Sequence, residues 1–160
     1  MVTKEVAMNF FDTGKKLTIG KINKFEKQIN YKLPEEYVKF LLEYNGGIPE
    51  KTVFVFDVDG KEEDSVIQVF YSIDNEDKLY DLFTVYEAMV EDEEIQGYFL
   101  PIAEDEFGNN ICIGLQNDNI GQIFFCDHEE DASEKIQFVS NNLNDFINSL
   151  IEDNDADDVD

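Results

Sequence analysis

The sequence predicts a single domain that combines helices with a sheet-rich body, and three observations support this. The chain has 160 residues, is 42% hydrophobic and contains 14 Phe and 7 Tyr, which is enough to bury a core and too apolar for a disordered polymer. Its hydrophobic period is about 3.6 at first, then about 2, and about 3.6 again further on. The segments of period 2 are rich in aromatic and β-branched residues and are separated by polar turns.

The N-terminal segment is expected to be an arm followed by a helix. Residues 1–16 show little periodicity and are predicted to be loosely attached, although Phe10 and Phe11 could dock on the body. Thr18 can cap a helix over about 18–29, where apolar side chains recur at helical spacing. The folded domain is therefore expected to begin near residue 17.

A second helix is predicted to begin at Pro34, because proline is favoured in the first turn of a helix. Its end is expected at Asn45-Gly46-Gly47, where positive φ angles can terminate the helix. An apolar stripe at positions i, i+3, i+4 and i+7 would face the core. The stripe consists of Tyr37, Phe40, Leu41 and Tyr44.

Residues 52–57 and 66–73 are predicted to form a β-hairpin around Val58-Asp59-Gly60, and residues 79–90 a further helix. The carboxylates before Gly60 could suggest a calcium loop. The glycine stands at the wrong position for an EF-hand, so an aspartate-glycine turn that needs no ion is favoured.

The remaining strands are predicted at 98–103, 110–115 and 122–127, the last two as an antiparallel hairpin. Pro101 lies inside the first of them and predicts an edge strand or a very short one. Ser140 can cap a last helix that reaches residue 151.

The segment 152–160 has six acidic residues and no apolar stripe, so it is expected to be a disordered tail. The sequence has no run of roughly 18 apolar residues that could span a membrane, and its N-terminus lacks the pattern of a signal peptide. We therefore expect a cytoplasmic protein.

Charge divides the chain into two unequal parts. Residues 1–61 carry ten lysines and nine acidic residues, whereas the rest carries 28 acidic residues and two lysines, which gives a net charge of −25. This excess of negative charge argues against nucleic acid and anionic membranes as direct ligands, because both are bound through clustered Lys and Arg. It favours a cationic partner instead.

No catalytic, metal-binding or cofactor-binding residue is predicted. Cys112, Cys126 and His128 could contribute metal ligands, since a turn centred near Asn119 would place the two cysteines opposite each other, but a fourth ligand is not visible. Buried thiols are the favoured interpretation. Pairs of carboxylates are unspecific among 37 acidic residues, and no phosphate-binding glycine loop is present.

Six segments occur in an order and spacing typical of one superfamily. An amphipathic helix is followed by LPEEYVKFLLEYNGG at 33–47, and FLPIA at 99–103 precedes FGNNICI at 107–113. GQIFFCDHE at 121–129 is a strand that ends in Asp-His, and a helix from Ser140 closes the pattern. Together these segments resemble the SUKH superfamily over about residues 18–151.

The resemblance implies a single α+β domain with a mainly antiparallel sheet of about five or six strands. Helices near the N-terminus, in the middle and at the C-terminus would pack on it. It also implies function, because bacterial members are mostly immunity proteins that bind and neutralise a toxin, often a nuclease. Fungal members resemble regulators and scaffolds of cell-wall synthesis.

The leading hypothesis is an immunity protein, a monomer or weak homodimer without cofactors, whose acidic face occupies the cationic groove of a toxin. The alternatives are a regulatory or scaffolding module and an enzyme with an unrecognised carboxylate site. Phe107 is the candidate hydrophobic anchor, although a core position is the favoured interpretation for this residue. The predicted partner-binding residues are Glu104, Asp105, Glu106, Phe107, Asp118, Asp127, Glu129, Glu130 and Asp131.

Overall fold

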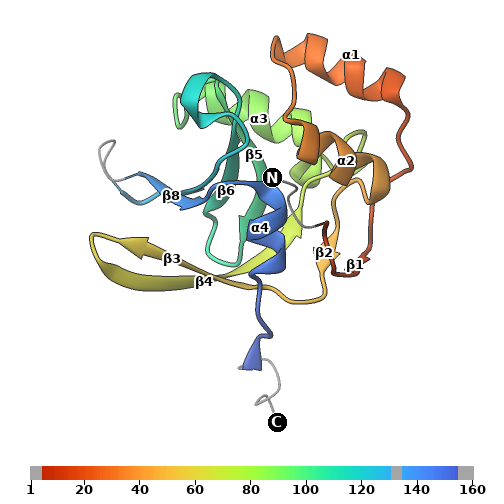
Figure 1. Cartoon of the computed structure of the whole chain (residues 1–160). Helices are drawn as coiled ribbons and strands as arrows, with labels where there is room; N and C mark the ends of the chain where they lie inside the picture. The colour runs from red at the N-terminus through yellow and green to blue at the C-terminus, as the bar shows by residue number, and fades with distance from the viewer. Residues whose placement is uncertain (1–4, 131–134, 155–160) are drawn as a thin grey trace.

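The computed structural model describes residues 5–130 and 135–154, which form a single α+β domain, as predicted (Figure 1). The elements in chain order are β1 (Phe10–Phe11), α1 (Ile19–Ile29), α2 (Glu35–Glu43), β2 (Ile48–Pro49), β3 (Val53–Val58), β4 (Lys61–Phe70), the 3₁₀ helix η1 (Lys78–Tyr80), α3 (Leu82–Glu91), β5 (Phe99–Asp105), β6 (Asn110–Gly114), the 3₁₀ helix η2 (Asn117–Asn119), β7 (Ile123–Cys126), β8 (Ile136–Ser140) and α4 (Leu143–Asn148).

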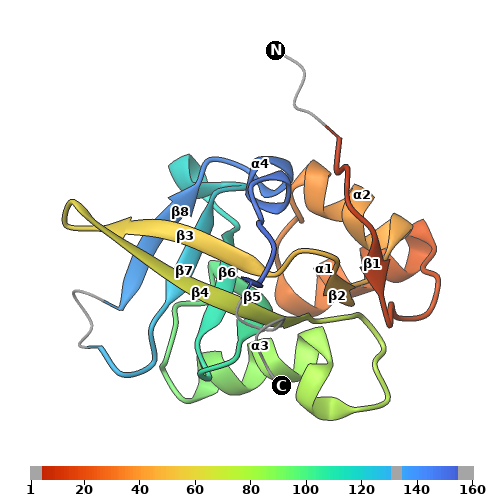
Figure 2. The ribbon, with the colours of Figure 1, turned by 90° about the horizontal axis from the view of Figure 1, so that it is seen from below.

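Six strands form one antiparallel sheet in the order β3-β4-β5-β6-β7-β8. The strands at its two ends, β3 and β8, also contact each other, although no ladder joins them in the described part of the chain. The sheet is therefore curled toward a barrel, and Figure 2 shows β3 running beside β8. We call its concave side the inner face, where the rings of Phe54 and Phe125 lie 5.9 Å apart.

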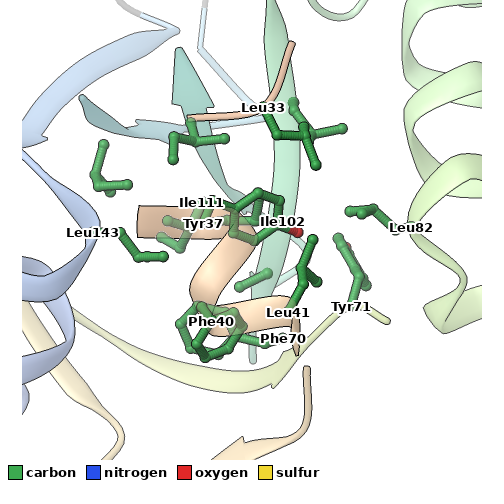
Figure 3. Packing of buried hydrophobic residues seen from close by; sticks show 14 of the residues in the cluster. Leu33, Tyr37, Phe40, Leu41, Phe70, Tyr71, Leu82, Ile102, Ile111 and Leu143 are labelled. Atoms are coloured by element: carbon green, nitrogen blue, oxygen red, sulfur yellow. The ribbon is translucent and has the colours of Figure 1, made fainter. Parts of the chain in front are cut away.

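The main core fills part of the inner face, where α2 and α4 pack against the sheet. α2 buries Tyr37, Phe40 and Leu41, the first three positions of the predicted stripe. Figure 3 shows their side chains among residues of the sheet such as Ile102 and Ile111. The helical spacing of this segment thus produces one wholly buried side of a short helix.

The outer face of the sheet is covered by α3. Met89 of α3 packs with Phe99, Cys112, Phe124 and Cys126 in a second, smaller cluster. The two clusters are separate because successive side chains of β6 and β7 point to opposite faces of the sheet.

The first predicted helix is confirmed as α1. The Thr18 hydroxyl accepts a hydrogen bond from the Lys21 backbone N–H at 3.3 Å, which satisfies one of the free donors of the first turn. The helix buries Ile22, Phe25 and Ile29, and its opposite side faces solvent.

The described part of the predicted N-terminal arm, residues 5–16, contacts the body. β1 pairs with β2, and Phe10 is buried with its ring 5.1 Å from that of Phe40. Asn148 of α4 accepts a hydrogen bond from the Ala7 N–H at 3.0 Å.

The prediction of an edge strand or very short strand around Pro101 is wrong, because β5 has seven residues and lies between β4 and β6. β4 pairs with residues 103–105 of β5. The β5–β6 register shifts between Pro101 and Ala103. The proline therefore lies at an irregularity of the sheet, where its missing N–H is tolerated.

Two further details of the prediction need correction. The β6–β7 register centres on residue 118, which places Cys112 opposite Phe124 and not opposite Cys126. Ser140 ends β8, and Asn142 caps α4 by accepting a hydrogen bond from the Asp145 N–H at 2.8 Å. The helix stops before residue 151, which instead forms a bridge with β3.

The predicted acidic tail lies mostly outside the described residues, which include only 152–154 of it. Among the helices that the structure describes, none is both long and apolar enough to cross a bilayer.

Candidate protein-binding site

The β3–β4 hairpin projects beyond the rest of the sheet (Figures 1 and 2). Its turn consists of Asp59 and Gly60, whose φ angles of 53° and 83° match the geometry that an aspartate-glycine pair favours. Because this turn has only two residues, the acidic segment 62–64, which lies between the two predicted strands, belongs to β4. The hairpin is therefore longer and more acidic than predicted.

The inner face opens at the end from which the hairpin projects, and we call this groove the mouth. It has a volume of about 340 Å³. Its apolar lining comes from Phe56, Val58, Phe107 and Phe125. Its acidic lining comes from Glu63, Asp64, Asp127 and Glu130.

The floor of the mouth is a pair of stacked rings. Phe56 and Phe125 lie 4.6 Å apart with an angle of 30° between their planes. Glu63 lies opposite Phe56 in the β3–β4 ladder, and Gln137 lies opposite Phe125 in the β7–β8 ladder. Directly opposed residues share a face of the sheet, so both polar side chains stand beside the aromatic floor.

Asp105 holds the β5–β6 loop in place from beneath. It is only 1% exposed, and its carboxylate accepts four hydrogen bonds. The Phe107 and Asn109 N–H groups donate to Oδ1 at 2.9 and 2.8 Å, while the Asn109 side-chain amide and the Ser65 hydroxyl donate to Oδ2 at 3.1 and 2.7 Å. Because Asp105 is buried and its oxygens are occupied, it shapes the surface that a partner would meet but does not contact the partner itself.

The same loop is tied to the segment after β7. The Asn109 Oδ1 atom accepts a hydrogen bond from the His128 N–H at 3.1 Å and lies 2.6 Å from His128 Nδ1. Gly108 has a φ of +85°, which lets the loop turn tightly between Phe107 and Asn109. Phe107 is 66% exposed, so the favoured prediction of a core position is wrong. It is an exposed aromatic side chain on a pre-organised loop.

Glu104 belongs to the other face of the sheet. It precedes Asp105 in β5 and forms a hydrogen bond with the Tyr71 hydroxyl, which also accepts one from the Asn110 side chain at 2.7 Å. Burial raises the pKa of the Glu104 carboxyl, while the hydrogen bond from Tyr71 partly opposes this and the neighbouring Asp105 adds to it. Glu104 therefore does not face the mouth.

The other predicted acids fall into three groups. Glu106 and Glu129 are exposed on the two segments that border the mouth. Asp118 is exposed in the β6–β7 connection, at the opposite end of these strands, because the mouth lies where β6 begins and β7 ends. Asp131 lies outside the described residues. The structure thus brings together Phe107, Asp127 and Glu130 from the predicted set.

The sequence-based prediction missed the contribution of the hairpin and of β8. Phe56, Val58 and Glu63 line the mouth from β3 and β4, and Gln137 does so from β8. Alternation on either side of the Asp59-Gly60 turn is a signal that could have placed the hairpin residues on one face. The contact between β3 and β7 across the curled sheet has no comparable signal in the sequence.

The cysteines and His128 do not come together as metal ligands. Cys112 and Cys126 are buried free thiols on the outer face, and burial raises the pKa of Cys126 to about 11. His128 is exposed and contacts Asn109. Across residues 5–130 and 135–154, no group of three or more His, Cys, Asp or Glu side chains is arranged to hold a metal ion.

Comparison with known proteins identifies a family. The sequence pattern of the SMI1 / KNR4 family (SUKH-1) matches residues 16–149, which is most of the chain. No curated protein matches the chain. The chain therefore belongs to the SMI1 / KNR4 family (SUKH-1).

Proposed function

We propose that this chain is an immunity protein that binds and neutralises a cognate bacterial toxin with a basic surface, and that the toxin docks at the mouth. One observation carries the proposal: a pre-organised, exposed Phe107 stands beside an aromatic floor and a rim of carboxylates. Interfaces take most of their affinity from a few such aromatic anchors surrounded by polar residues.

The distribution of charge supports a basic partner. Six exposed lysines, on α1 or close to it, lie at the end of the molecule opposite the β3–β4 hairpin (Figure 1). They are Lys15, Lys16, Lys21, Lys24, Lys27 and Lys32. Three of them form ion pairs with acidic residues, so this end is close to neutral and the other end carries the excess negative charge. A basic toxin would thus be attracted mainly by the acidic end, which orients the encounter and raises the association rate at low salt.

Phe107 is expected to provide affinity, and the carboxylates around it a high association rate and selectivity. A buried Phe side chain contributes roughly 1.5–3 kcal/mol, and Phe107 still has two thirds of its surface to bury, so its removal should cost about 1–2 kcal/mol of binding free energy. Carboxylates that remain at a solvated rim contribute little to affinity and mainly affect the association rate.

The test is binding to a toxin domain encoded beside this chain. Phe107→Ala should weaken the complex about 5- to 30-fold, which corresponds to the 1–2 kcal/mol above. Leu79→Ala is the matched control, because Leu79 is 73% exposed but lies on η1, away from the mouth. Equal losses for the two variants, or no loss for either, would contradict docking at the mouth.

A regulatory or scaffolding module would use the same surface for a different protein. Co-expression separates the two functions, since only an immunity protein restores growth to cells that express the neighbouring toxin. A stable complex without rescue would point to the regulatory role.

A further inference from the structure

We infer that the mouth receives an arginine side chain of the partner. The identity of the partner rests on the proposed function, whereas the chemistry of the groove does not. The inference combines the stacked floor, the two carboxylates that stand beside it and the size of the opening.

The floor suits a flat cation. The half-buried Phe56 ring stacks on the buried Phe125 ring with 30° between their planes, and the exposed ring of Phe107 borders the same space, so the accessible aromatic surface comes from Phe56 and Phe107. A guanidinium group is planar and weakly hydrated, and it stacks on aromatic faces with a favourable cation–π interaction. An aliphatic side chain would cover the rings but would offer no hydrogen-bond donor to the adjacent carboxylates.

The carboxylates supply the matching acceptors. Glu63 stands beside Phe56 on the inner face. Asp127 follows Phe125 by two residues, just beyond β7, and its N–H still donates a hydrogen bond to the Lys135 carbonyl at 2.8 Å, so it continues on the same side. None of the described residues that line the mouth is a lysine or arginine. A guanidinium has five N–H donors in a fixed plane, so it can stack on the floor and bond carboxylates on both sides.

Other cations fit less well. A lysine ammonium is compact and strongly hydrated, and it gains less from flat aromatic walls. A divalent ion such as calcium needs six or more oxygen ligands, whereas the acidic side chains among the described residues are not arranged in a group that could hold a metal ion. The volume of about 340 Å³ is near the lower limit for ligand pockets, so it suits one long side chain and its neighbours better than a whole helix.

The experiment is an NMR titration of the ¹⁵N-labelled protein with N-acetyl-L-arginine methylamide, compared with the corresponding lysine compound. We expect saturable shifts in the amides of Phe107, Asn109 and Gln137, and at least threefold weaker binding of lysine. The Glu63→Gln, Asp127→Asn double variant should weaken arginine binding at least tenfold. The control Glu87→Gln, Glu91→Gln removes the same charge from exposed positions of α3 and should leave binding unchanged.

Three results would overturn the inference: shifts that do not saturate, equal affinity for lysine, or equal weakening by the two double variants. Failure of the proposed function is a separate result. If arginine binds in the mouth but no neighbouring toxin is neutralised, the immunity role fails and the arginine site stands. If a toxin is neutralised and Glu63→Gln, Asp127→Asn leaves its affinity unchanged, the arginine site fails alone.

Discussion

Replacing Asp105 with alanine should loosen the wall of the mouth that carries Phe107. The buried carboxylate accepts four hydrogen bonds from Ser65, Phe107 and Asn109 at 2.7–3.1 Å. Hydrogen bonds to a charged group contribute roughly 1.5–3 kcal/mol each, but burying the charge costs several kcal/mol in return. The net loss of unfolding free energy for Asp105→Ala is therefore expected to be about 2–4 kcal/mol.

Asp105→Asn gives the graded comparison. Its amide oxygen can still accept from the two backbone N–H groups at Oδ1, and its NH₂ group can donate to the Ser65 hydroxyl. It cannot accept from the Asn109 side chain, so we expect a smaller loss of about 1–2 kcal/mol. Glu106→Ala, at the exposed neighbouring position, should stay within about 0.5 kcal/mol of the unchanged protein.

The assay is urea unfolding followed by circular dichroism, with the slope of the transition checked for constancy. Asp105→Ala within 0.5 kcal/mol of the unchanged protein would refute the role of this carboxylate as the centre of the loop. An Asp105→Asn variant less stable than Asp105→Ala would also refute it, because the hydrogen bonds would then not determine the order.

Three further predictions concern the fold. Tyr37→Phe should raise the unfolding free energy by about 1 kcal/mol, because the Tyr37 hydroxyl is buried without a hydrogen-bond partner among the described residues; a destabilised variant would contradict this. Glu104→Gln should be neutral at pH 4 and stabilising at pH 7 in urea unfolding. The raised pKa of Glu104 means that the folded state favours the protonated carboxyl, so the native protein loses stability as the pH rises above 4.5, and a difference that does not change with pH would refute the cause. Gly46→Ala should cost more than about 2 kcal/mol, measured by thermal unfolding against the control Gly60→Ala. Both glycines have positive φ, but an added Cβ at Gly46 would lie 2.5 Å from the Tyr71 carbonyl oxygen, whereas Gly60 has open space; equal losses would contradict the steric reason.

Much of the fold could be predicted from local patterns. α1 and α2 follow from an apolar stripe with Thr18 and Pro34 at their starts, and the β3–β4 turn follows from Asp59-Gly60. β5 could not be placed correctly from the sequence. Pro101 is tolerated inside it because β4 pairs only with residues 103–105 and the register with β6 shifts next to the proline. That is a property of the assembled sheet and has no local signal.

The candidate site could be predicted only in part. The acids and Phe107 near the β5–β6 loop stand out in the sequence, and the convergence of this loop with the end of β7 follows from hairpin pairing. Whether a given acid is exposed does not follow, as neighbouring Glu104, Asp105 and Glu106 show, since alternation and buried hydrogen bonds give each a different environment. The aromatic floor depends on the curl of the sheet, which brings β3 to β7.

The location of the partner is tested most directly by amide hydrogen exchange of this protein, with and without a toxin domain encoded beside it. Docking at the mouth predicts at least tenfold slower exchange in residues 56–65, 105–109 and 125–130, with α1 and η1 unchanged. Protection that is confined to α1 or η1, with the mouth unchanged, would contradict it.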